Sequence, residues 1–117
     1  MDNLEFTEEF DKHYYKIRDV AEMLNVPTST LRYWESEFPE IKPKRSLSNQ
    51  RYYRPDDIRM IRIIHYLVKV KGLRIDAAKE EMRTNRNNVS KRIDVIDRLT
   101  ETRNELKEIL DALNKRH

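Results

Sequence analysis

Helix-breaking residues are few in this chain, and their positions limit where helices can begin and end. The four prolines and the single glycine all lie between residues 27 and 72, as Pro27, Pro39, Pro43, Pro55 and Gly72. Proline lacks the amide hydrogen that a helix interior needs, whereas glycine readily adopts the left-handed conformation that ends a helix. Between residues 27 and 72 the chain must therefore consist of short elements, while the lack of proline and glycine over residues 88–115 favours one long helix.

Apolar residues between these breaks recur at helical spacing. Ile17, Val20, Ala21 and Leu24 follow the i, i+3, i+4, i+7 pattern of one helix face. The Pro-Asp-Asp sequence at residues 55–57 is typical of a helix start, because proline suits the first position and carboxylates stabilise the positive end of the dipole. The patterns predict helices over residues 18–24, 28–38, 55–71, 76–83 and 88–115.

A β-hairpin is predicted after Pro43. Its turn is the Ser-Leu-Ser-Asn sequence at residues 46–49, and a basic, aromatic strand follows. Because successive strand residues face opposite sides, one of Tyr52 and Tyr53 packs inward. We expect Arg51 and Tyr53 to share one face and Tyr52 to lie on the other.

The formal net charge of +3 conceals a local concentration of positive charge. Residues 42–62 contain seven lysines and arginines against two aspartates, whereas residues 1–11 contain five acids and no base. A concentrated basic segment is the usual electrostatic footprint of a nucleic-acid binder. Taken alone, the same run also fits a solvated charged face.

The predicted helix over residues 28–38 has one apolar and one polar face. At 100° per residue, its apolar stripe consists of Leu31, Trp34 and Phe38. The opposite face carries Ser29, Arg32, Tyr33 and Ser36. Short hydroxyls followed by a cation and a phenol suit a recognition helix, whose side chains reach base edges and phosphates in the major groove. Without the neighbouring helix and hairpin, this face would indicate only an ordinary surface helix.

A helix-turn-helix followed by a hairpin and further helix is the element order of a winged helix-turn-helix domain. The predicted fold is mainly α, with a small β-hairpin wing and a long C-terminal coiled-coil helix. We expect an acidic N-terminal arm over residues 1–13, a DNA-binding domain over residues 14–85 and a dimerisation helix over residues 86–117.

The composition excludes several other classes of protein. There is no cysteine, and His13, His65 and His117 lie far apart, which argues against disulfides, zinc ribbons and histidine metal sites. No apolar run approaches the roughly 20 residues that span a bilayer, and no signal pattern is present at the N-terminus. We therefore expect a cytoplasmic, nucleoid-associated protein with no catalytic residues, no metal, no cofactor and no membrane partner.

Three parts of the sequence resemble the MerR family of bacterial transcriptional regulators. They are Lys16-Ile17-Arg18-Asp19-Val20-Ala21, then Thr30-Leu31-Arg32-Tyr33-Trp34-Glu35, then Arg51-Tyr52-Tyr53 with Asp57-Ile58. The resemblance covers roughly residues 15–82 and implies a homodimer that binds a pseudo-palindromic promoter site through winged helices, where RNA polymerase is a further partner. It also implies that the two copies join through an antiparallel coiled coil. The chain is similar to a short member, without a separate effector domain and without the cysteines of metal-sensing and oxidant-sensing relatives.

The resemblance assigns DNA contacts to the second helix and to the hairpin. These residues are Thr28, Ser29, Thr30, Arg32, Tyr33, Arg45, Arg51 and Tyr53. The mixture of cations and tyrosines in the hairpin adds Lys44, as a further phosphate contact. The family position of Trp34 can lie near the DNA backbone, whereas its helical angle points to the core, and both interpretations stay open. Two departures are local: Asn49 replaces the usual glycine of the hairpin turn, and Pro27 replaces the usual serine cap, which leaves Thr28 or Asn25 to cap the helix.

The last predicted helix carries an apolar stripe that is interrupted once, by Arg103. We predict that it forms the dimer interface through Val89, Ile93, Ile96, Leu99, Leu106, Leu110 and Leu113. Two consecutive spacings of three make it a short, locally adjusted seam rather than a strict heptad repeat. Alternatively, the helix folds back on its own domain.

Two functions fit these patterns. The first is a sequence-specific transcriptional regulator of double-stranded DNA. The second is an architectural, chromosome-organising or recombination accessory protein that uses the same winged helix. An enzyme has no support, because the carboxylates lie on charged faces with no apolar pocket beside them.

Overall fold

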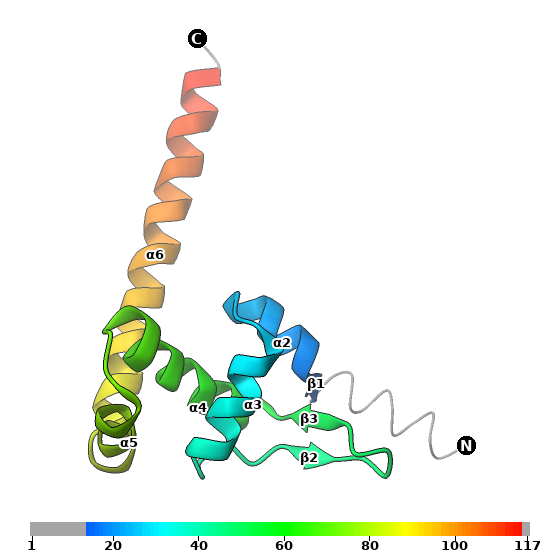
Figure 1. The fold of residues 1–117 in the computed structure, drawn as a ribbon. Coiled ribbons are helices and arrows are strands. Elements are labelled where there is room, and N and C mark those ends of the chain that lie inside the picture. The colour runs from blue at the N-terminus through cyan, green and yellow to red at the C-terminus, as the bar shows by residue number, and fades with distance from the viewer. Residues whose placement is uncertain (1–13, 116–117) are drawn as a thin grey trace. The chain divides into compact units, whose positions relative to one another are not determined.

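The computed structural model describes residues 14–115 (Figure 1). Strand β1 and helices α2 and α3 come first, followed by two further strands, and helices make up the rest of the described chain. The order is β1 (Tyr15–Lys16), α2 (Ile17–Leu24), α3 (Thr28–Glu37), β2 (Lys44–Arg45), β3 (Arg51–Tyr53), α4 (Pro55–His65), η1 (Tyr66–Val70), α5 (Ile75–Thr84) and α6 (Arg86–Lys115). The mainly α fold with a small hairpin is confirmed, while the acidic arm predicted over residues 1–13 lies outside the described residues.

The hairpin belongs to a three-stranded antiparallel sheet with the order β1-β3-β2. Lys44 pairs with Tyr52 and Arg45 with Arg51, whereas β1 pairs Tyr15 with Tyr53 on the other side of β3. We call residues 44–53 the wing. The sequence analysis missed β1, because a strand of two residues is too short to show alternation.

Three residues with positive φ shape the connections. Asn25 (φ 55°) ends α2, Asn49 (φ 65°) closes the wing turn, and Gly72 (φ 77°) ends the helical segment that begins at Pro55. Asparagine tolerates the left-handed conformation better than most residues, so Asn49 replaces glycine in the turn. The predicted stop at Gly72 is confirmed, although the segment widens to a π-helix, η1, after His65.

The core of the first unit lies among α2, α3 and α4, which pack against one another. The predicted stripe of α3 is buried in full: Leu31, Trp34 and Phe38 are each at most 1% exposed. The helical angle of Trp34 therefore gives its position correctly, and the side chain lies in the core. Further core residues are Val20, Ala21, Ile41, Tyr53, Ile58, Ile61, Ile63, Ile64, Leu67, Ala78 and Met82.

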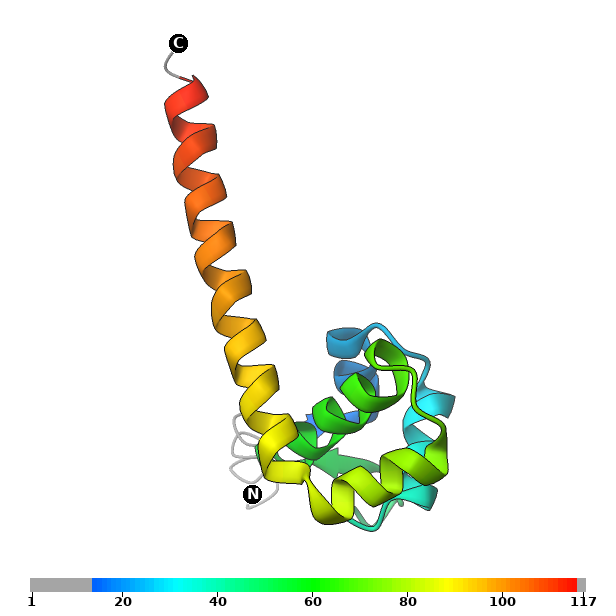
Figure 2. The same cartoon turned by 90° about the vertical axis from the view of Figure 1, so that its left-hand side faces the viewer.

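After Thr84 the chain divides into a second compact unit, which consists of α6. Helix α6 has 30 residues and is unbroken, as the lack of proline and glycine predicts (Figure 2). Its first predicted interface residues, Val89 and Ile93, are buried. The other five are exposed: Ile96, Leu99, Leu106, Leu110 and Leu113. None of the helices within residues 14–115 is long and apolar enough to cross a membrane.

His65, at the end of α4, meets the core tryptophan edge-on. Its ring centroid lies 6.3 Å from that of Trp34, with the planes at 70°. Burial lowers the pKa of His65 from its ordinary 6.5, and the positive charges of Lys69 and Arg62 lower the pKa further. The fold thus favours the neutral imidazole.

We expect the free energy of unfolding to fall as the pH is lowered from 7.5 to 5.5. At pH 7.5 His65 is largely neutral in both states. As the pH falls through 6.5, the unfolded chain binds a proton that the folded chain resists, so acid favours unfolding. Urea denaturation at both pH values measures the loss, and His65→Gln should reduce it. An equal loss in the variant would contradict the assignment.

Candidate nucleic-acid interface

The outer face of α3 presents the side chains that the sequence assigns to DNA contacts. Ser29, Arg32, Tyr33 and Ser36 are all exposed, while Thr28 and Thr30 are half-buried. The Ser36 hydroxyl donates to the Tyr33 carbonyl at 2.6 Å, one turn back along the helix. A cation, a phenol and short hydroxyls therefore share one solvent-facing surface, and such groups bond to phosphates and base edges.

The N-terminus of α3 has no side-chain cap. Pro27 is the N-cap residue, and its carbonyl accepts a hydrogen bond from the Thr30 amide at 3.0 Å. Neither Thr28 nor Asn25 caps the helix as expected, since Asn25 instead ends α2 in the left-handed conformation. The positive end of the helix dipole consequently adds to the attraction of this surface for an anion.

A single carboxylate joins α3 to the wing. Glu35 Oε1 accepts a hydrogen bond from Arg45 Nη2 at 2.9 Å, and Glu35 Oε2 accepts one from Arg51 Nε at 2.8 Å. The Tyr53 hydroxyl donates to the same Oε2 at 3.3 Å. Only 13% of the Glu35 side chain and 20% of the Arg51 side chain are exposed, so solvent screens their ion pair weakly, whereas Arg45 is 42% exposed and its pair is screened more. Both strands of the wing are thereby held against the helix.

Arg51 and Tyr53 lie on the same face of β3, as predicted, and this face points inward. Tyr53 is fully buried, so it belongs to the core and offers no surface to DNA, contrary to its place in the predicted contact set. Burial raises the pKa of its phenol well above the ordinary value, and the negative charge of Glu35 raises it further against the opposing charge of Arg51. The phenol therefore stays protonated and donates to Glu35.

The base of the wing is held by a second buried carboxylate, Asp57, in the first turn of α4. Its Oδ2 accepts a hydrogen bond from the Arg54 amide at 3.0 Å, and its Oδ1 accepts one from the Lys42 amide at 3.2 Å. Because these amides lie before and after the wing, one side chain fixes both ends of the hairpin. The predicted role of Asp57 at the helix dipole is thus only part of what it does.

The remaining predicted wing residues differ in how far they reach solvent. Lys44 and Arg45 are exposed, whereas Arg51 is half-buried. The Lys44 ammonium lies 5.7 Å from the ring centroid of Tyr14, within cation–π range. Arg45 also donates to the Asn49 side chain at 3.1 Å, so it supports the turn as well as pairing with Glu35.

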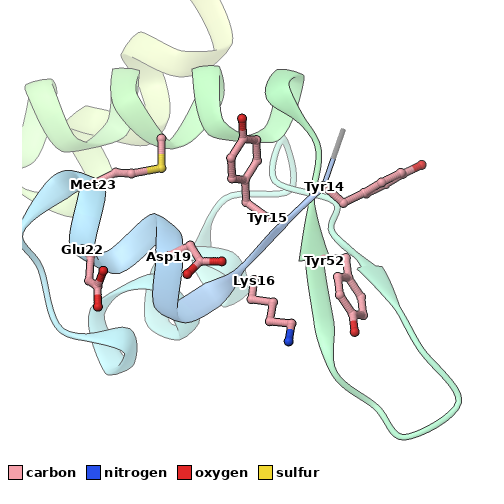
Figure 3. Close-up of a pocket in the computed structure, with 7 residues that line it drawn as sticks. All are labelled: Tyr14, Tyr15, Lys16, Asp19, Glu22, Met23 and Tyr52. Atoms are coloured by element: carbon pink, nitrogen blue, oxygen red, sulfur yellow. The ribbon is translucent and has the colours of Figure 1, made fainter. Parts of the chain in front are cut away.

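A cavity of about 610 Å³ opens on another side of this unit (Figure 3). Its lining residues are Tyr14, Tyr15, Lys16, Asp19, Glu22, Met23 and Tyr52. The rings of Tyr15 and Tyr52 point in opposite directions, so they do not converge on one ligand. Two carboxylates also make this surface less favourable for phosphate than the outer face of α3 and the wing.

The residues that organise this surface, Glu35 and Asp57, were given no binding role in the sequence analysis. Glu35 stands in the quoted family signature, although α3 also carries Glu37 and its one cation is Arg32. Its place in that signature is the signal that could have identified it. Its partners lie 10 to 18 residues away, so the sequence alone does not pair them.

The sequence matches a known family along most of the first unit. The family model described as MerR HTH family regulatory protein matches residues 15–85. No curated protein matches the chain.

Solved structures similar to this chain include the following two. One is the crystal structure of HiNmlR, described as a MerR family regulator lacking the sensor domain, bound to promoter DNA; it is 20% identical, with 88% of this chain and 86% of that chain covered and a TM-score of 0.49. The other is a MerR family transcriptional regulator from Bacillus thuringiensis, 23% identical, with 87% and 98% covered and a TM-score of 0.48.

We expect Glu35→Gln to lower the free energy of unfolding by about 1–3 kcal/mol, because two arginines and a buried phenol lose their anionic acceptor. Urea denaturation at pH 7 measures the change. Glu37→Gln is the matched control, since 32% of the Glu37 side chain is exposed and its ion pair with Lys79 on α5 is screened by solvent, so its loss should cost less than the loss of Glu35. Equal losses in the two variants would contradict a special role for Glu35.

Proposed function

The chain belongs to the MerR helix-turn-helix family of regulatory proteins, and we propose that it acts as a homodimer on a pseudo-palindromic promoter site. Members of this family are DNA-binding transcriptional regulators, so this chain is a DNA-binding regulator and not an enzyme. We further propose RNA polymerase as a partner at the promoter and the cytoplasmic nucleoid as the location. The observation that carries the proposal is the exposed face of α3 beside a wing that ion pairs hold in place.

In this proposal α3 enters the major groove. Arg32 has the charge and reach for a phosphate or a guanine edge, and the exposed Ser29 and Tyr33 flank it. Thr28 and Thr30 contribute at the uncapped helix start. Lys44 and Arg45 contact the backbone from the wing, and Arg51 assists from its half-buried position. Tyr53 acts from the core by holding Glu35.

The homodimer is supported by the exposed part of the α6 stripe. Leu99, Leu106, Leu110 and Leu113 are each at least half exposed. Four leucines on one helix side form a seam that a second copy would cover, with a gain of roughly 1.5–3 kcal/mol for each side chain fully buried. Two-fold symmetry of the dimer would match a pseudo-palindromic site. Val89 and Ile93 are already buried, so the proposed seam begins at Ile96.

Selection of binding sequences from a random duplex pool, followed by footprinting, tests the function. We expect one short pseudo-palindrome, which then serves as the operator in the experiments below. Many dispersed sites without a common sequence would favour the architectural function instead.

Arg32→Ala should weaken operator binding by roughly tenfold to a hundredfold, because a bidentate base contact or a phosphate contact is lost. Titrations at several salt concentrations separate the two contacts, since only loss of a phosphate contact lowers the salt slope, by about one. Arg83→Ala is the matched control, an exposed arginine of α5 paired with Glu80. Unchanged affinity in Arg32→Ala would refute the assignment of α3.

Replacing Leu106 and Leu110 together by lysine should convert the dimer to a monomer, because two charges would enter an apolar seam. Light scattering should then give 14.3 kDa instead of twice that mass. The control, Asn104→Lys with Ala112→Lys, adds the same charge at exposed positions outside the stripe. A dimer that persists in the leucine variant would place the interface elsewhere. A native chain that is itself monomeric would exclude the dimer.

A further inference from the structure

The tip of the wing carries a leucine that the function described so far does not use. Leu47 has a relative exposure of 109%, the highest among the large exposed apolar side chains of the described residues. We propose that Leu47 is an apolar wedge that enters the DNA minor groove and partly unstacks one base step. This inference rests on the proposed function, because it requires DNA as the partner of the wing.

The turn that presents Leu47 is held by its own hydrogen bonds. The Ser46 amide donates to the Gln50 carbonyl at 2.9 Å, and the Asn49 amide donates to the Ser46 carbonyl at 2.8 Å. The Gln50 amide donates to the Ser46 hydroxyl at 3.1 Å. The Ser46 and Ser48 hydroxyls are also bonded, at 2.9 Å. These bonds hold the backbone of the turn in one conformation, although the Leu47 side chain that it presents is fully exposed.

The charge around the turn favours an anionic partner such as DNA over an apolar protein surface. Lys44 and Arg45 precede the turn, Arg51 follows it, and Arg45 bonds directly to Asn49 within it. No acidic residue lies between positions 41 and 55. The two serines beside Leu47 are short enough to let it project, and their hydroxyls can bond to phosphate or sugar oxygens. Figure 1 shows the hairpin loop extending away from α3, so the tip contacts DNA beyond the site of the helix.

An apolar side chain in this position has a known physical effect on a duplex. Leucine and similar side chains insert between base steps from the minor groove, and the cost of unstacking is offset by burial of the side chain and by wider contact with the bent duplex. Leucine carries no group that reads a base or neutralises a phosphate. Its removal should therefore change the shape of the bound DNA more than the salt dependence of binding.

The test uses the 117-residue chain and the selected operator, with 2-aminopurine at successive base steps and a dye pair at the duplex ends. We expect the native chain to raise the 2-aminopurine fluorescence at one step and to bend the duplex. Leu47→Ala should abolish that rise, reduce the bend and weaken binding roughly fivefold at an unchanged salt slope. Leu47→Phe, which retains a wedge, should keep the fluorescence rise.

Val70→Ala is the matched control, because Val70 is 65% exposed at the end of η1, outside the wing. It should behave like the native chain. If the fluorescence rise and the bend seen with the native chain persist with Leu47→Ala, the wedge is overturned and the proposed function stands. A lower salt slope in Leu47→Ala than in the native chain has the same consequence. Absence of any sequence-specific complex with the native chain overturns the proposed function and the wedge with it.

Discussion

The geometry of the first unit depends on the carboxylate of Glu35. It is the point where α3 meets both strands of the wing, through Arg45 from β2 and through Arg51 and Tyr53 from β3. A hairpin with strands of two and three residues has few interstrand hydrogen bonds and little apolar area, too little to fix its position against α3. The ion pairs, together with the buried ring of Tyr53, supply that orientation.

This arrangement divides the cations of the unit into two groups. Arg51 and, in part, Arg45 form ion pairs with Glu35, and its negative charge offsets some of the positive charge that the basic segment shows in the sequence. Arg32 and Lys44 are exposed on the surface where an anion can approach. Some of the cations of the basic segment therefore hold the wing to α3, and fewer of them are available to DNA than a count of lysines and arginines suggests.

The second unit follows a simpler rule. A helix of 30 residues without proline or glycine forms from local preference, but most of its apolar side chains are exposed in the part of the chain that the structure describes. The exposed leucines are the physical reason to expect a second copy of the chain. In the homodimer that we propose, the DNA-binding surface would be doubled with two-fold symmetry, so the same seam would bear on which sites the protein can bind.

The sequence by itself determined the helices, the stop at Gly72, the buried stripe of α3 and the family. Each of these follows from spacing, local backbone preference or a short motif. Only the tertiary structure decided that Tyr53 is buried, that Glu35 holds the wing, that Asp57 bonds to both ends of it and that β1 completes the sheet. Apart from the bond between Arg54 and Asp57, which are three residues apart, these features join residues 10 to 38 positions apart. Their pairing depends on how elements pack and leaves no periodic trace in the sequence.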